Sequence, residues 1–375
     1  MTQFNLEAIR QDFPIVDHTV YLNHAAVGPL PRSVETAVSR FYKMRLTQTA
    51  AVWDLAQPEY ERGRALAAKL VNGKAENIAY IQNTSHGVSL IANGLAWQSG
   101  DNVIVPAREF PSNYLVWQNL RQHGVEVREV AVENGRVTAA QIAPLIDART
   151  RVVTLSHVQY FNGYQVDLAP IGDLCRQHDA LLIADGTQSI GAITLDVARC
   201  SIDALVVSAH KWMLGPLGIG FMALSERAME RVAVSIVGWL SVQEPFDFVP
   251  DKVLLADANR FEPGTENGAG KFGLLARLEQ IDAIGADVIE QRVLALTDRL
   301  CAGVEARGYR VTSHRDEGEK SAIITFDHPT HGGELLLQRL QQANIQASLR
   351  HGAIRISPHY YNSETEIDLV LEALL

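Results

Sequence analysis

Short apolar runs alternate with amphipathic stretches between about residues 65 and 225, and this alternation constrains the fold more than any other feature of the sequence. Seven runs have the length and the apolar content of buried strands. They read NIAYIQ, NVIVPA, VEVREVAV, RVVTLSH, ALLIADG, DALVVSA and GIGFMAL. Strands that alternate with helices form a mostly parallel sheet that is covered by helices on both faces. The sequence therefore predicts an α/β fold with a mostly parallel, seven-stranded sheet.

The pattern changes after the seventh run. Residues 232–265 contain three prolines and look irregular, and a long helical stretch is predicted over roughly 267–308. The remaining segments, SAIITFDH, GGELLLQRLQQAN, GAIRISP and SETEIDLVLEALL, alternate again between strand and helix patterns. We therefore predict a smaller α+β domain after the large one. The predicted boundaries are 18–265 for the large domain and 266–375, joined by 1–17, for the small one.

Composition excludes several classes of protein. The formal net charge of −10 and the lack of a basic cluster argue against a nucleic-acid partner. No apolar run is long enough to span a membrane, and the N-terminal residues do not resemble a signal peptide. The three cysteines, Cys175, Cys200 and Cys301, are scattered and form no C-x-x-C motif, so neither a disulfide framework nor a metal site is expected. These features predict a cytoplasmic protein.

Polar and aromatic side chains follow the strands where they end, which is where ligands bind in such a sheet. Thr84 and Ser85 come at the start of a helix, where hydroxyls and free amides bind phosphate, although they could simply cap the helix. Asp185 follows a buried strand and is either a ligand or a structural turn residue. Phe110 lies just past another strand, as a core residue or as a platform for a flat ring.

Lys211 lies past a further strand end and follows His210 in the stretch VVSAHKWMLGPLG. Lysines are usually solvated surface charges, but the neighbours here are apolar or small. Burial in such surroundings lowers the pKa of a lysine and makes it a nucleophilic amine. His210 is either a buried structural histidine or a partner of a nearby phosphate.

These strand ends together offer partners for one ligand. A helix N-terminus suits a phosphate, an aromatic side chain suits a flat ring, a carboxylate suits a ring nitrogen, and an amine suits an aldehyde. Pyridoxal 5′-phosphate carries all four groups. The sequence therefore predicts pyridoxal phosphate as the cofactor.

In these residues the chain resembles the class V aminotransferases, a fold-type I group of pyridoxal-phosphate enzymes that includes cysteine desulfurases and isopenicillin N epimerase. The resemblance runs from VYLNHAAVGPLP near the start to AIRISPHYYNSETEID near the end. Its most specific elements are NTSHGV, DGTQSIG, SAHKWMLGPLGIG and RFEPGTEN. It implies a homodimeric enzyme that acts on a small α-amino acid.

The resemblance also implies roles for individual residues. Lys211 would form the Schiff base with the cofactor, Asp185 would keep the pyridine nitrogen protonated, and Phe110 would stack on the ring. Gln188 would bond the 3-oxygen of the ring, and Thr265 would reach the phosphate bound by the partner subunit. The remaining implied cofactor-binding residues are Thr84, Ser85, His86, Ser208 and His210.

Arg355 aligns with the arginine that binds the substrate carboxylate in this family, a task that suits a guanidinium. The alternative is a surface ion pair with the acidic segment SETEID. The apolar flanks of Arg355 favour the binding role. The resemblance further implies that the substrate pocket is lined by Asn23, His24, Ala25 and Tyr160.

Transamination is the predicted activity, because it needs only Lys211 and no further acid. The alternatives are a C–S or β-elimination lyase, with residues 350–352 (RHG) near the entrance serving an unusual amino acid, and an epimerase with Tyr160 or His24 as second proton donor. Desulfurases carry a nucleophilic cysteine on the loop before the carboxylate-binding arginine. The loop here, SLRHGA at 348–353, has none. The sequence therefore argues against a persulfide-forming cysteine desulfurase.

Overall fold

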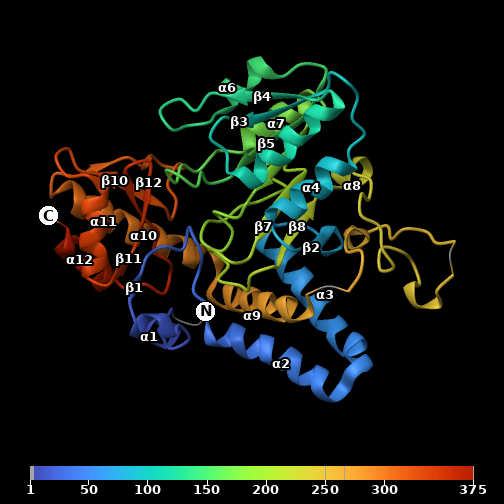
Figure 1. Ribbon diagram of the computed structural model, residues 1–375, viewed down its shortest axis with the longest axis horizontal. Helices are drawn as coiled ribbons and strands as arrows, with labels where there is room; N and C mark the ends of the chain where they lie inside the picture. Colours follow the sequence, from blue (N-terminus) through green and yellow to red (C-terminus); the bar gives the residue numbers. More distant parts are fainter. Residues whose placement is uncertain (1–3, 250, 266, 375) are drawn as a thin grey trace.

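The chain forms a large layered α/β part beside a smaller α+β part in the computed structural model, which describes residues 4–249, 251–265 and 267–374 (Figure 1). A seven-stranded sheet lies at the centre of the large part, in the order β2-β8-β7-β6-β5-β3-β4. Only β8 runs antiparallel to its neighbours. The strands are β2 (Ile78–Ile81), β3 (Asn102–Pro106), β4 (Glu126–Val130), β5 (Thr150–Ser156), β6 (Leu181–Asp185), β7 (Ala204–Ser208) and β8 (Gly220–Leu224). The predicted mostly parallel sheet is confirmed.

The central strands are largely apolar because both faces of the sheet are covered. In β7, Leu205 and Val207 belong to one buried cluster, whereas Ala204 and Val206 belong to the other. Helices α4 and α7 contribute to opposite clusters, so they cover opposite faces. The helices around the sheet are α4 (Thr84–Gly94), α5 (Leu115–Asn119), α6 (Ala139–Ile142), α7 (Ala169–Gln177) and α8 (Glu226–Arg231).

The register of the sheet brings its polar strand ends to one edge. Ser156 at the end of β5 pairs with Asp185 at the end of β6, and Asp185 pairs with Val206 in β7. Ser208 ends β7 one pleat further along. The side chains that follow these strands therefore start from neighbouring points, as expected for parallel strands.

Helix α9 (Gly268–Ile284) packs against α2 (Arg32–Gln48) and α3 (Val52–Val71) beneath the sheet (Figure 1). The prediction of one helical stretch over 267–308 is wrong in one respect. Gly285 has a φ of 96°, which breaks the helix and separates α9 from α10 (Ala286–Glu305).

The smaller part contains a four-stranded antiparallel sheet in the order β12-β13-β10-β9. The N-terminal segment joins it, because β1 (Val20–Tyr21) pairs with β11 (Ile345–Gln346) and Asn23 bridges to Ser357. The domain boundaries stay a prediction. The other elements are α1 (Leu6–Arg10), β9 (Arg310–Val311), β10 (Ile324–Asp327), α11 (Gly333–Gln342), β12 (Ser348–Arg350), β13 (Ala353–Ile356) and α12 (Glu364–Ala373).

Segments between these elements contain short 3-10 turns, and residues 232–249 and 251–265 are otherwise irregular, as predicted. The turns are Pro14–Asp17, Thr49–Ala51, Ala75–Asn77, Pro111–Asn113, Leu120–His123, Ala143–Leu145, Pro245–Asp247 and Ala258–Phe261. Among the described residues, no helix has both the length and the apolar character needed to cross a membrane.

Candidate functional site

Lys211 is a buried lysine that follows β7, with 8% of its surface exposed. Its Nζ lies 5.1 Å from the centre of the Phe110 ring. Burial lowers the pKa of Lys211 to about 8; Asp185 opposes this effect, whereas the charges of Arg355 and Arg350 add to it. This lowered pKa favours the predicted nucleophilic amine, since part of the amine is uncharged near neutral pH.

Asp185 ends β6 and is buried beside Lys211. Its Oδ1 accepts a hydrogen bond from the backbone N–H of Thr187 at 2.9 Å. Burial raises the pKa of Asp185, whereas the bonds from Thr187 and the charge of Lys211 lower it. A carboxylate in this position can pair with a protonated ring nitrogen.

Three hydroxyl groups meet at the start of α4. Thr84 Oγ1 lies 2.8 Å from Thr187 Oγ1 and 2.9 Å from Ser208 Oγ. The backbone N–H of Thr84 donates to Ser208 Oγ at 2.8 Å. Asn83 fills the capping role, because its Oδ1 accepts from the N–H of His86 at 2.9 Å. The hydroxyls of Thr84 and Ser208 thus stand at a helix N-terminus that already has a cap, which suits an anion such as phosphate.

Thr187 was not singled out in the sequence, although it lies between two residues that were, Asp185 and Gln188. Gly87 allows the whole arrangement, because a Cβ at that position would lie 2.7 Å from Val206 Cγ1 on β7. Only glycine lets α4 approach the sheet so closely.

The other predicted phosphate-site residues lie around this cluster. Ser85 Oγ donates to Ser112 Oγ at 2.9 Å. His86 Nδ1 accepts from the N–H of Gln82 at 3.2 Å, and His210 is half-buried. Burial lowers the pKa values of both histidines. Thr265 is exposed and lines a pocket together with Asn83 and His86.

Gln188 is held by two hydrogen bonds. Its Nε2 donates to the carbonyl of Ala25 at 3.0 Å, and its Oε1 accepts from Trp212 Nε1 at 2.9 Å. The N-terminal segment and the residue after Lys211 therefore fix the orientation of this side-chain amide. Trp212 was not recognised from the sequence as part of the site.

Phe110 is 37% exposed, so it is not a core residue. Tyr160 packs edge-on against it, with ring centres 5.3 Å apart. Together with the nearby Lys211 Nζ, this geometry favours the predicted platform for a flat ring.

Arg355 lies in β13 and is 1% exposed. Its Nε donates to Ser348 Oγ at 3.2 Å and its Nη1 to the carbonyl of Tyr160 at 2.7 Å, whereas its buried Nη2 has no hydrogen-bond partner among the described residues. Burial and then the charge of Arg350 lower the pKa of Arg355 to about 9. The alternative of a surface ion pair is excluded, and a buried donor is left for a substrate carboxylate.

The predicted pocket residues Asn23, His24 and Ala25 differ in what they offer. Asn23 Oδ1 is buried and accepts no hydrogen bond within the part of the chain that the structure describes. His24 is fully buried, and both ring nitrogens are engaged, by the Ser357 carbonyl at 2.7 Å and the Tyr361 hydroxyl at 2.8 Å. Burial lowers the pKa of His24 to about 3, so His24 does not suit the role of a second proton donor.

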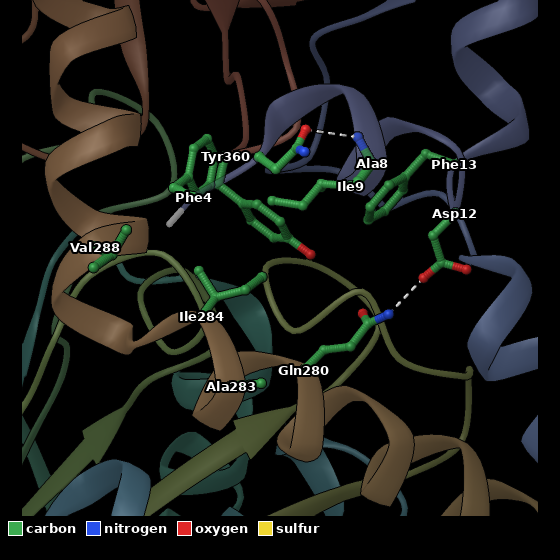
Figure 2. Close-up of a pocket in the computed structure, with 11 residues that line it drawn as sticks. Phe4, Ala8, Ile9, Asp12, Phe13, Gln280, Ala283, Ile284, Val288 and Tyr360 are labelled. Atoms are coloured by element: carbon green, nitrogen blue, oxygen red, sulfur yellow. Dashed lines mark hydrogen bonds between the residues drawn. The ribbon is translucent and has the colours of Figure 1, made fainter. Parts of the chain in front are cut away.

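An apolar pocket elsewhere in the molecule contains none of these residues. It lies between α1, α9 and α10, and Figure 2 shows Phe4, Ile9, Ile284 and Tyr360 around it. Its polar groups are satisfied, since Gln280 Nε2 donates to Asp12 Oδ2 at 2.6 Å. The candidate site is therefore the cluster around Lys211.

Comparisons with known proteins agree with this geometry. The family model Aminotransferase class-V matches residues 20–370. A curated relative, the probable cysteine desulfurase of Methanothermobacter thermautotrophicus, is 30% identical over 98% of this chain and 97% of that protein.

Solved structures have the same fold. The apo cysteine desulfurase of Thermococcus onnurineus NA1 superimposes with a TM-score of 0.89 at 24% identity, over 99% of this chain and 98% of that one. The cystine C–S lyase C-DES, in complex with its product cysteine persulfide, gives a TM-score of 0.88 at 25% identity, over 96% and 98% of the two chains. A mutant of C-DES has glycine covalently linked to its pyridoxal-phosphate cofactor.

These findings correct the predicted activity. The relatives are named cysteine desulfurases and a C–S lyase, so the prediction of a transaminase is wrong. The argument against the desulfurase group is wrong as well, because it rested on one loop cysteine, whereas the relatives in that group match nearly the whole chain. The lyase alternative fits the relatives better.

Proposed function

This chain belongs to the Aminotransferase class-V family, and we propose that within it the protein is a lyase that cleaves the Cβ–S bond of a cysteine-derived amino acid such as cystine. Membership confirms the family and the fold predicted from the sequence, as well as pyridoxal phosphate as the cofactor. The cytoplasmic location stays a prediction.

The residues around Lys211 fit this cofactor. Lys211 is a buried amine without an ion-pair partner among the described residues, and Phe110 lies across from it. Asp185 would hold the ring nitrogen, and Gln188 would contact the ring oxygen. The phosphate would be bound by the hydroxyls at the start of α4, which come from Thr84, Thr187 and Ser208.

When bound, pyridoxal phosphate supplies an electron sink that stabilises negative charge at the substrate Cα and so permits loss of a β-substituent. The chain supplies the rest. Arg355 would bind the α-carboxylate through its free Nη2, and Lys211 Nζ would take the proton from Cα as a general base. Asp185, whose carboxylate is buried, would keep the proton on the ring nitrogen.

A second arginine, Arg350, would determine which substrate is preferred. Arg350 lies close enough to lower the pKa values of both Lys211 and Arg355. Arg350 Nη1 donates to the neighbouring Leu349 carbonyl at 2.8 Å. A substrate with one carboxylate satisfies Arg355 alone, whereas a disulfide such as cystine carries a second carboxylate for Arg350.

The burial of all three cysteines supports a reaction in which the sulfur leaves as part of the product and is not transferred to a protein thiol. Cys175, Cys200 and Cys301 are all buried as free thiols. The elimination would convert cystine and water into pyruvate, ammonia and cysteine persulfide. The sulfur leaves as the persulfide, so no thiol of the protein is needed to accept it.

Product analysis tests this proposal. The purified protein with pyridoxal phosphate is incubated with L-cystine, and pyruvate, ammonia and low-molecular-weight persulfide are measured. Equal amounts of the three products are expected. Alanine in place of pyruvate, or sulfur bound to a cysteine of the protein, would assign the reaction to another branch of the family.

The matched variants are Arg350→Gln and Arg62→Gln, the second at an exposed arginine on α3. Arg350→Gln is expected to weaken the binding of cystine far more than the binding of cysteine, since only cystine has a second carboxylate. Arg62→Gln should change neither. Equal effects of Arg350→Gln on both substrates would contradict the role of Arg350.

The homodimer and the contact of Thr265 with the partner's phosphate site also remain proposals. An irregular arm projects away from the sheet (Figure 1) and exposes large apolar side chains. They are Ile236, Val237, Trp239, Phe246, Phe248, Val249, Val253 and Leu254. A second copy would cover this surface, and light scattering coupled to gel filtration measures the resulting mass. Thr265→Ala should weaken cofactor binding in the dimer.

A further inference from the structure

Glu109 is a buried carboxyl group next to the site that the proposed reaction does not use. It directly precedes Phe110 and is 6% exposed. Three donors converge on it: the Phe110 N–H reaches Oε1 at 2.7 Å, Ser156 Oγ reaches Oε1 at 2.5 Å, and the Ser156 N–H reaches Oε2 at 2.6 Å. Glu109 therefore connects the segment after β3 to the end of β5.

We propose that Glu109 is a positioning residue for Phe110: it ties the Phe110 backbone to Ser156 and so fixes the aromatic platform relative to Asp185 and Lys211. The geometry of the sheet gives this connection its effect, because Ser156 is the register partner of Asp185. Glu109 thus links Phe110, which would stack on the cofactor ring, to β5. The neighbouring strand β6 carries Asp185, which would bind the ring nitrogen. The inference rests on the proposed cofactor site.

A carboxyl group suits this place because both of its oxygens accept hydrogen bonds. A glutamine of the same length offers one oxygen and one NH₂ group, and the latter would face a backbone N–H. Loss of a buried acceptor leaves its donors unpaired, which is costly. The bridge therefore needs glutamate, rather than any polar side chain of that size.

The position of Glu109 also has an electrostatic cost, which speaks against a role in stability alone. The pKa of Glu109 is raised to about 7, chiefly by burial and in addition by the charge of Asp185 on β6, although the bonds from Ser156 and Phe110 lower it. No lysine, arginine or histidine forms an ion pair with Glu109 among the described residues. A stabilising group would rarely be placed without a cation in a buried site beside a second carboxyl group.

The chain offers a matched control in Glu366, a buried carboxyl group in the small domain. It accepts from the Ser363 N–H at 2.8 Å and from Asn362 Nδ2 at 3.0 Å. Replacement of either glutamate by glutamine removes a buried acceptor, but only Glu109 lies beside the candidate site. The two variants therefore separate a positioning role from a general loss of stability.

The test compares Glu109→Gln, Ser156→Ala and Glu366→Gln in the full chain, with and without added pyridoxal phosphate. The first readout is hydrogen exchange, measured by mass spectrometry, of the peptides that contain Phe110 and Ser156. The second readout is the visible circular dichroism of the bound cofactor together with its dissociation constant. Hydrogen exchange needs no cofactor, so it tests the hydrogen bonds of Glu109 even if the protein does not bind pyridoxal phosphate.

We expect exchange at the Phe110 or the Ser156 amide to accelerate about tenfold or more in Glu109→Gln, since the glutamine NH₂ group leaves one of these two backbone N–H groups without its acceptor. The cofactor band should weaken and the dissociation constant should rise. Ser156→Ala should show a smaller change in the same direction, because it removes one of the three bonds. It also serves as the test variant if Glu109→Gln fails to fold.

Glu366→Gln should lower the melting temperature without changing the cofactor band. Unchanged exchange at both Phe110 and Ser156 in Glu109→Gln and Ser156→Ala, or an equal loss of the cofactor band in Glu366→Gln, would overturn the proposal. A wild-type chain that binds no pyridoxal phosphate would instead show that the proposed function itself has failed.

Discussion

Replacement of Arg355 by glutamine is expected to make the free protein more stable while it destroys substrate binding. The pKa of Arg355 is lowered from 12.5 to about 9, chiefly by burial. Because folding lowers the pKa of Arg355, burying the charged guanidinium reduces the free energy of unfolding. This destabilisation is fully present below pH 9, where Arg355 is charged. At 1.36 kcal/mol for each pH unit, the upper limit is about 5 kcal/mol. The lost bonds to Ser348 and Tyr160 offset about 1–3 kcal/mol of it.

A net gain of at most about 2–4 kcal/mol remains, which corresponds to a rise of about 3–6 °C in melting temperature at pH 7. The difference between variant and wild type should shrink as the pH rises above 9, because wild-type Arg355 then loses its charge. For substrates with an α-carboxylate, kcat/KM should fall at least about 100-fold, since an ion pair with the substrate is lost.

Scanning calorimetry without substrate and steady-state kinetics measure the two effects. The control is Arg310→Gln, at an exposed arginine of the same sheet that pairs with Asp327 at 2.6 Å. A surface pair is worth about 0–1 kcal/mol, so this variant should be slightly less stable and fully active. A lower melting temperature in Arg355→Gln together with unchanged kcat/KM would refute the reasoning.

Three further predictions concern the proposed cofactor-binding site. Asp185→Asn keeps the shape of the side chain but removes its charge, so single-turnover deprotonation of the substrate should slow by about 100-fold or more; an unchanged rate would count against the ring-nitrogen role. Because the pKa of Lys211 is about 8, the rate at which the cofactor-free protein condenses with pyridoxal phosphate should rise with pH through about 8, in stopped-flow absorbance. A flat profile between pH 7 and 9 would contradict the lowered pKa. Gly87→Ala places a Cβ 2.7 Å from Val206 Cγ1 and 2.8 Å from Ile81 Cδ1, so it should cost about 1–3 kcal/mol of unfolding free energy and weaken cofactor binding; wild-type values in denaturant titration would exclude this close packing.

The sheet could be predicted from the sequence because burial on both faces leaves a plain signal. All five residues of β6 and of β7 are buried, so each strand appears as an apolar run that ends in one polar residue. The residues that follow these strands were accessible for the same reason. Lys211 stood out because it is a charge among apolar neighbours, and the structure buries it.

Contacts between distant segments left no such signal. Ser156 Oγ donates to Glu109 across 47 positions, and neither residue belongs to a periodic pattern that marks the pairing. The two-residue strand β1 is too short to show alternation, and its partner β11 lies more than 300 positions away. The burial of Arg355 without a counter-ion depends on the packing of Tyr160 and Ser348, which no local rule gives.

The activity was predicted wrongly because the motifs around Lys211 serve every reaction of the family. We propose that the branch depends on residues that approach the substrate from other elements, such as Arg350 on β12. One missing loop cysteine was given too much weight, since sulfur can also leave on the substrate. Local motifs therefore identified the cofactor but not the bond that breaks.

The most direct test of the account is to find which lysine the cofactor modifies. The protein is loaded with pyridoxal phosphate, reduced with borohydride and digested, and the peptides are mapped by mass spectrometry. The account predicts a phosphopyridoxyl group on Lys211 and none on Lys271, the lysine that is 6% exposed and paired with Glu262 at 2.8 Å. A label on Lys271, or no label on Lys211, would contradict it.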